Sequence, residues 1–132
     1  MIFTNIVPRV SETDGVGHIN NVFVPIWFEA GRREIFRIFS PNLDFVNWKL
    51  ALVKVTVEYV DQLYLAENVE IRTGIEKIGN SSFTIKEEIH QTDRLCAKGE
   101  AIYVNYNFNE KKSETISNEI RDKLQSVKFI ES

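Results

Sequence analysis

A polar, glycine-containing loop that runs directly into the most apolar helical pattern of the chain is the feature that most constrains this sequence. The segment 11–39 reads SETDGVGHINNVFVPIWFEAGRREIFRIF. Its apolar residues recur at spacings of three and four, which predicts one helix from residue 22 to residue 39 with a continuous buried face. We expect Ser40, Pro41 and Asn42 to end this helix.

Asp14 stands on this loop about seven residues before the expected start of the helix. The first amides of a helix have no partner within it and lie at the positive end of its dipole, so they suit an oxygen that becomes negative during a reaction. A nearby carboxylate can then act as general base or nucleophile on a carbonyl that these amides polarise. The alternative is that Asp14 only caps a turn shaped by Gly15 and Gly17.

Composition limits the classes of protein to consider. With 132 residues, 43% of them hydrophobic, the chain fits one domain with a modest core. The net charge of -3 and the lack of a dense basic run argue against a nucleic-acid binder. Neither a signal peptide nor an apolar run of the ~20 residues that span a bilayer is evident, so we expect a cytoplasmic protein without a membrane segment. A single cysteine, Cys96, disfavours both a disulfide and a zinc site.

Alternating apolar and polar residues predict strands in most of the remaining sequence, at 2–10, 52–61, 68–78, 83–89 and 95–108. In the second of these, one face is expected to carry Val53, Val55, Val57 and Tyr59. Short turns separate the last four strands, which favours an antiparallel sheet covered by the helix. A helical tail is expected at about 113–128, with Ser113 as its N-cap.

The loop motif D-G-V-G-H-I-N-N, followed by W-F-E-A-G-R, resembles the hotdog-fold acyl-CoA thioesterases of the 4-hydroxybenzoyl-CoA thioesterase type. The matching positions are Asp14, Gly17, His18, Ile19, Asn20, Asn21, Glu29, Ala30 and Arg32. The resemblance continues at V-E-Y-V-D-Q-L (57–63) and I-G-N-S-S-F (78–83), and it covers about residues 3–108. It implies a single α+β hotdog domain over 1–132, in which a five-stranded antiparallel sheet wraps around one long central helix and a short C-terminal helix follows.

The same resemblance implies hydrolysis of an acyl-CoA thioester to a free acid and coenzyme A. Asp14 is then the base or nucleophile, and the amide at or near Asn21 stabilises the oxyanion. His18 either assists the thioester or braces the loop. Substrate contacts are expected from Gly17, Asn20, Trp27, Ser81 and Ser82. Contacts to the coenzyme A phosphates are expected from Arg72, Lys77, Lys86, Arg94 or Lys98. Neither a metal nor a separate cofactor is implied, because coenzyme A is part of the substrate.

Family architecture also implies a homodimer joined sheet edge to sheet edge, often paired into a homotetramer, with active sites shared between subunits. An unpaired strand edge gives a physical reason for such pairing. The sequence departs from the family pattern at Val24, Pro25 and Gln62, and Pro25 leaves the oxyanion donor open because proline lacks an N–H. Two alternatives therefore stay open, a non-catalytic acyl-thioester-binding hotdog protein and a thioesterase acting on acyl carrier protein, while a hotdog dehydratase is less favoured.

Overall fold

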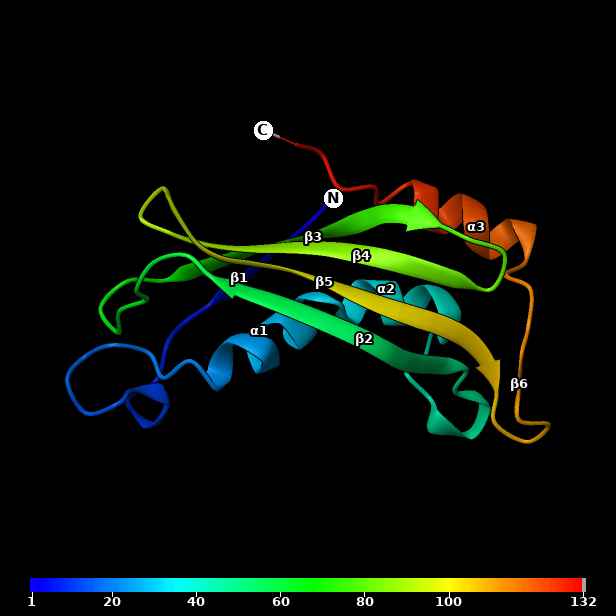
Figure 1. Cartoon of the computed structure of the whole chain (residues 1–132), viewed down its shortest axis with the longest axis horizontal. Helices are drawn as coiled ribbons and strands as arrows, with labels where there is room; N and C mark the ends of the chain where they lie inside the picture. The colour runs from blue at the N-terminus through cyan, green and yellow to red at the C-terminus, as the bar shows by residue number, and fades with distance from the viewer. Residues whose placement is uncertain (132) are drawn as a thin grey trace.

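One antiparallel sheet makes up most of the chain in the computed structural model, which describes residues 1–131 (Figure 1). The long strands are β1 (Ile2–Ile6), β2 (Leu50–Tyr59), β3 (Val69–Ile78), β4 (Ser82–Gln91) and β5 (Arg94–Asn107). They lie in the order β1-β3-β4-β5-β2, and each neighbouring pair is antiparallel. A short strand, β6 (Lys112–Ser113), pairs with the end of β5. β1 and β2 are therefore the edge strands.

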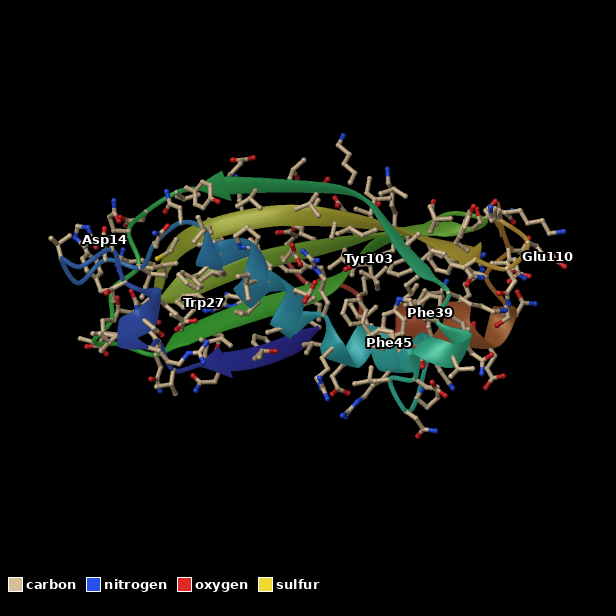
Figure 2. The ribbon with its side chains drawn as sticks, turned by 90° about the horizontal axis from the view of Figure 1, so that it is seen from below. Asp14, Trp27, Phe39, Phe45, Tyr103 and Glu110 are labelled. Carbon is tan, nitrogen blue, oxygen red and sulfur yellow. The ribbon has the colours of Figure 1, made fainter. Side chains whose placement is uncertain are left out.

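Two helices, α1 (Phe23–Gly31) and α2 (Arg33–Phe39), lie end to end across one face of this sheet (Figures 1 and 2). Phe28 on α1 and Ile35 on α2 are fully buried. They belong to two neighbouring clusters of the core, the first including Ile71 and the second Ile85. A curled antiparallel sheet around a central helical segment is the hotdog fold that the sequence predicts.

The single long helix expected over 22–39 is wrong in detail, because it is interrupted at Arg32. This residue has φ −87° and ψ −4°, and its amide donates to the carbonyl of Glu29, three residues back. The preceding residue, Gly31, lies so close to β3 that an added Cβ would be 2.6 Å from Oγ1 of Thr73. The break coincides with this close approach and with a hydrogen bond from the Arg32 side chain to Glu87 on β4.

The face expected from alternation in β2 is also wrong, because β2 is largely exposed on both sides. The register with β5 shifts between Leu52 and Lys54, so Val53 is unpaired and the alternation changes there. Val53, Val55 and Tyr59 are exposed, and of the predicted face only Val57 packs against the core. The helices cover β3 and β4 rather than β2, which leaves this edge strand bare within one chain.

The C-terminal helix, α3 (Asn118–Gln125), packs on α2 and the edge of β3, but it starts later than predicted. Ser117, rather than Ser113, is the N-cap, because its hydroxyl accepts the Ile120 amide at 3.2 Å while Ser113 lies in β6. Beyond α3, the backbone of Phe129 bonds to Ile75 and so protects part of the β3 edge. Within residues 1–131, none of the helices combines the length and apolarity needed to cross a bilayer.

Candidate active site

The loop predicted to carry catalysis is a small hairpin anchored to the sheet. The Asp14 amide donates to the His18 carbonyl at 2.9 Å, and the Asn20 amide donates to the Glu12 carbonyl at 2.9 Å. Gly15 and Gly17 between these pairs have φ values of +93° and +88°, a conformation that favours glycine. The loop motif therefore folds as a tight turn that brings Asp14 and the start of α1 to the same end of the molecule (Figure 2).

A buried glutamine that the sequence analysis did not single out holds the segment on which this hairpin rests. The Ile19 amide donates to the Leu63 carbonyl at 2.8 Å. The Gln91 side chain accepts the Tyr64 amide at 2.9 Å and donates to the carbonyls of Tyr64 and Glu67 at 2.8 Å. A polar residue at a core-facing position at the end of a predicted strand is the signal that would have indicated this role.

Asp14 and His18 are neighbours on the hairpin, and both are partly open to solvent. Oδ2 of Asp14 lies 4.0 Å from Nδ1 of His18, and their side chains are 39% and 38% exposed. Oδ1 of Asp14 accepts the Val16 amide at 3.0 Å, which is the turn-capping bond of the structural alternative. The His18 ring packs edge-on against Tyr64 with 5.1 Å between ring centroids. One carboxylate oxygen thus caps the turn, while the second lies beside a histidine.

The amide of Asn21 is the unpaired donor at the entry to α1. The amides of Val22 and Phe23 both donate to Asn20, the first to its side chain at 3.1 Å and the second to its carbonyl at 3.0 Å. The Val24 amide donates to the Asn21 carbonyl at 3.2 Å. No hydrogen bond among residues 1–131 uses the Asn21 amide itself. Pro25 therefore leaves this donor intact, since it stands four residues later.

Trp27, predicted as a substrate contact, is buried in the core of its own chain and only 3% exposed. Its indole N–H donates to Oε2 of Glu12 at 2.9 Å. Burial raises the pKa of the Glu12 carboxyl, but the hydrogen bonds from Trp27 and Arg9 more than offset this and hold the pKa below its ordinary value. Within one chain, Trp27 thus fixes the base of the hairpin rather than lining an open surface.

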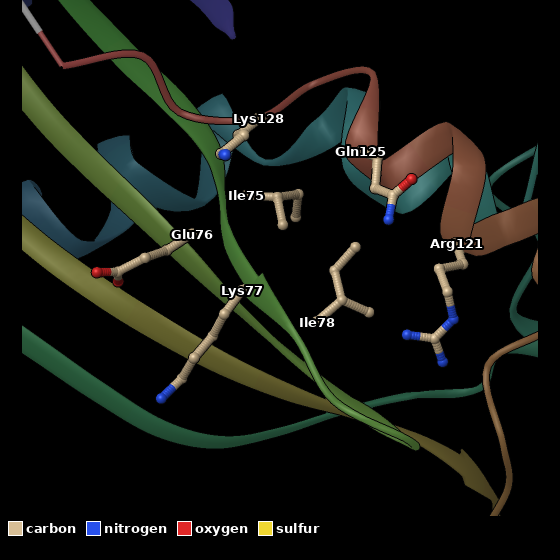
Figure 3. Close-up of a pocket in the computed structure, with 7 residues that line it drawn as sticks. All are labelled: Ile75, Glu76, Lys77, Ile78, Arg121, Gln125 and Lys128. Carbon is tan, nitrogen blue, oxygen red and sulfur yellow. The ribbon is translucent and has the colours of Figure 1, made fainter.

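Ser81 and Ser82 lie at the other end of the sheet from Asp14, Ser81 in the turn between β3 and β4 and Ser82 as the first residue of β4. Near this turn, a cavity of about 220 Å³ separates β3 from α3, and Lys77, Arg121 and Lys128 line it (Figure 3). Of the predicted phosphate contacts, Arg72, Lys86, Arg94 and Lys98 already form ion pairs. Lys77 has none among the described residues. Arg94 lies at the Asp14 end, where its guanidinium is 5.7 Å from the centroid of the Tyr64 ring that packs against His18, whereas Lys77 lines the cavity at the opposite end.

A buried ion pair at the helix break was missed by the sequence analysis. Arg32 is 2% exposed, and it donates from Nε and Nη2 to the two carboxylate oxygens of Glu87, each at 2.7 Å. Its Nη1 also donates to the hydroxyl of Tyr103 at 3.1 Å. Burial raises the pKa of the Glu87 carboxyl, and Arg32 opposes this by stabilising the carboxylate. Two adjacent arginines on a predicted buried helix, and a glutamate at a core-facing position of the predicted strand 83–89, were the sequence signals.

Known proteins share the sequence pattern and the fold described above. Residues 8–124 match the family described as Thioesterase-like superfamily. The chain belongs to the thioesterase-like superfamily. This membership confirms the resemblance seen in the motif D-G-V-G-H-I-N-N and the predicted enzyme class, a thioester hydrolase. No curated protein matches this thioesterase-like chain.

Solved structures agree with the fold of this thioesterase-like chain. A predicted thioesterase from Bacillus stearothermophilus is 52% identical, with a TM-score of 0.94 over 99% of this chain and 98% of that one. A thioesterase from Thermus thermophilus, solved with coenzyme A and Zn, is 19% identical, with a TM-score of 0.83 over 94% and 97% of the two chains. A 1,4-dihydroxy-2-naphthoyl-CoA thioesterase from Synechocystis is 14% identical, with a TM-score of 0.80 over 96% of each.

Other residues of this thioesterase-like chain offer less chemistry. Cys96 is buried, and burial raises the pKa of its thiol, so it is a packed residue rather than an activated nucleophile. Among residues 1–131, His, Cys, Asp and Glu side chains do not gather in threes as metal ligands. The catalytic and substrate-binding roles of the individual residues, and the expectation of no cofactor, stay predictions.

Proposed function

We propose that this chain hydrolyses acyl-CoA thioesters to a free acid and coenzyme A, with Asp14 as the catalytic carboxylate. The observation that carries this proposal is that one short hairpin joins two groups unused within residues 1–131, the Oδ2 atom of Asp14, which accepts no hydrogen bond there, and the unpaired amide of Asn21. Because Glu12 pairs with Asn20 and Asp14 with His18, strand spacing puts the Cα atoms of Asp14 and Asn21 roughly 10 Å apart. In this proposal the thioester group lies between the Asp14 carboxylate and the Asn21 amide.

In this proposal, the Asn21 amide donates to the carbonyl oxygen and stabilises its negative charge as the tetrahedral intermediate forms. Asp14 either takes a proton from the attacking water or attacks the carbonyl itself to form an anhydride that water then cleaves. In both routes the C–S bond breaks, and in this proposal His18 protonates the departing thiolate. One oxyanion donor typically contributes about 2.7 to 4 kcal/mol to such a transition state.

Assembly as a homodimer through β2 is part of the proposal. The outer edge of β2 has no partner strand among the described residues, and Leu52, Val55 and Tyr59 are exposed on it. An unpaired edge with exposed apolar side chains favours pairing with another strand. In a two-fold dimer, β2 pairs antiparallel with its own copy, and full-length pairing puts Leu50 opposite the partner's Tyr59.

Such a dimer accounts for the distance between Asp14 and the serines of the β3–β4 turn. The two-fold axis reverses one sheet relative to the other, so the Ser81 end of one subunit lies at the Asp14 end of its partner. Ser81, Ser82 and Lys77 then approach the site of the other subunit, where the coenzyme A moiety would extend. Coenzyme A in the Thermus thermophilus structure supports this class of substrate. A homotetramer and a cytoplasmic location also stay predictions.

Thiol release from a panel of acyl-CoA thioesters tests the proposed function. We expect wild type to hydrolyse part of the panel and Asp14→Asn to lose most of that rate. Saturable binding without thiol release over hours would favour the non-catalytic alternative. Hydrolysis confined to acyl-pantetheine on a carrier protein would favour a thioesterase that acts on acyl carrier protein.

Asp44 offers a matched control for the turn-capping alternative. Its Oδ1 accepts the Val46 amide at 2.8 Å, which is the bond that Asp14 makes with the amide of Val16 at 3.0 Å. Asp44→Asn therefore alters the same kind of turn-capping bond at a residue that has no role in the proposed chemistry. Equal rates for the two variants would reduce Asp14 to a structural residue.

A further inference from the structure

An open groove between α1 and β2 combines apolar walls with a buried arginine. Its volume is about 210 Å³, and it is lined by Pro25, Ile26, Glu29, Arg32, Leu52 and Val55. Ile26 is 58% exposed and Leu52 is 47% exposed, so the chain's own side chains do not fill it. The four helical residues lie on one face of α1 and its junction with α2, on a path that leads away from the Asn21 amide.

Arg32 lines this groove and retains hydrogen-bond donors that are unused among the described residues. A guanidinium group has five N–H donors in a fixed plane. Three of them are engaged, two by the Glu87 carboxylate and one by the Tyr103 hydroxyl. The two remaining donors belong to a side chain that is held rigidly by Glu87, and Arg32 is one of the residues that line the groove. A rigid donor at the floor of an apolar groove suits an oxygen acceptor on an otherwise apolar ligand.

The charges around the groove determine which oxygen fits. Glu87 already compensates the positive charge of Arg32, and Glu29 adds an exposed negative charge to the lining. The local sum is therefore negative, which disfavours a carboxylate and favours an uncharged hydroxyl or carbonyl. From Asn21 to Arg32 the helical rise gives a distance of about 16 Å, so this oxygen must lie far from the thioester.

We infer that the groove binds the acyl group of the substrate and that Arg32 donates a hydrogen bond to an uncharged oxygen near its far end. The inference rests on the proposed function, because it names the acyl class that the Asp14 site hydrolyses. The occupant is an acyl chain with a distal hydroxyl or carbonyl group. In the proposed dimer, the second copy covers the groove at β2 and encloses that chain.

Three thioesters of equal length test the inference with wild type alone: dodecanoyl-CoA, ω-hydroxydodecanoyl-CoA and the CoA monothioester of dodecanedioic acid. A hydrogen bond to a charged donor is expected to raise kcat/KM for the hydroxylated substrate roughly ten- to hundredfold over the plain one. The dicarboxylic substrate should be the poorest. If wild type hydrolyses the plain and hydroxylated substrates equally, the Arg32 subsite is wrong while the proposed function stands. If it hydrolyses no acyl-CoA, the proposed function fails.

Variants then show whether Arg32 causes the preference. In Arg32→Met/Glu87→Leu both charges are removed together, and the ratio between the hydroxylated and plain substrates should fall to near one. Arg33→Met is the matched control, since Arg33 is the adjacent exposed arginine, and it should keep the wild-type ratio. Glu29→Gln should raise the rate with the dicarboxylic substrate alone. A ratio unchanged in the double variant would overturn the assignment, because a purely structural effect lowers both rates alike.

Discussion

Arg32, at the junction of α1 and α2, donates two hydrogen bonds of 2.7 Å to Glu87 in the middle of β4, and both side chains are almost fully buried. A buried charge without its partner is far more costly than the absence of both charges. The pair therefore ties the interrupted helix to the sheet, at the floor of the groove between α1 and β2.

Removing one member of this pair should destabilise the protein strongly. We expect Arg32→Met or Glu87→Leu alone to lower the free energy of unfolding by about 3 to 5 kcal/mol, because each leaves an unpaired buried charge. Arg32→Met/Glu87→Leu should cost clearly less than either. Urea denaturation measures all three, and Arg37→Met, which breaks an exposed pair with Glu34, should change stability by only about 0 to 1 kcal/mol. A double variant as unstable as the two single effects combined would contradict this account.

Acid should weaken the contact between Glu12 and Trp27. The pKa of Glu12 lies below its ordinary value of 4.5, so its carboxylate contributes stability that is complete above that pH and is lost as the pH falls through the lower, folded-state pKa. Trp27→Phe removes the indole donor, so it should lower the free energy of unfolding more at pH 7 than at pH 3. Urea denaturation at both pH values measures the difference.

Trp48→Phe is the control for this pH dependence. The Trp48 indole donates at 3.1 Å to the backbone carbonyl of Leu50, which does not titrate. The loss in the free energy of unfolding caused by Trp48→Phe should therefore differ little between the two pH values. If Trp27→Phe also costs the same at both, the carboxylate of Glu12 is not the partner that matters.

Much of this fold was predictable from the chain, and the parts that were not share a physical cause. Alternation in Val69–Ile78 and turn residues at Gly79 and Thr92 report local geometry, so β3 and these turns were predicted closely. The first strand, predicted over 2–10, ends at Ile6. The helix break at Arg32 depends on Glu87, which is 55 residues away, and helical periodicity carries no trace of it. The exposure of β2 likewise depends on which strands the helices cover.

In the candidate site, too, local relationships were predictable from the sequence and long-range ones were not. The motif D-G-V-G-H-I-N-N predicts that Asp14 and the helix start lie together, because they are joined by a short turn. Ser81 and Ser82 could not be related to Asp14 from the sequence, since their relation in the proposed dimer depends on which sheet edge meets the second copy. Gln91, which holds the segment below the hairpin, acts through long-range bonds to Tyr64 and Glu67.

The role of Asn21 should reside in its backbone and not in its side chain. Asn21→Ala keeps the amide, so its turnover should stay within about threefold of wild type. Asn21→Pro removes an N–H that makes no hydrogen bond among the described residues, and kcat should fall roughly 10²- to 10³-fold. Steady-state thiol release, with circular dichroism to verify folding, measures both. Equal activities of the two variants would exclude this amide as the oxyanion donor.

Charge on the exposed edge of β2 should prevent assembly. We expect Val55→Lys to shift the sedimentation profile from dimer to monomer and to lower activity with it, because the proposed site is completed by the partner. Val46→Lys places the same charge at a residue that is 84% exposed and lies off β2, and it should stay dimeric and active. A wild-type protein that is monomeric at micromolar concentration, or an active monomeric variant, would contradict the shared site.

The rate of a single turnover by Asp14→Asn, measured together with the Kd of the same acyl-CoA, tests the central claim most directly. The side chain acts in the transition state, so the chemical step should slow by at least about 100-fold while Kd changes by less than about threefold. Asp44→Asn should match wild type in both quantities. A wild-type chemical rate in Asp14→Asn, or a loss confined to Kd, would contradict the assignment of Asp14 as the catalytic carboxylate.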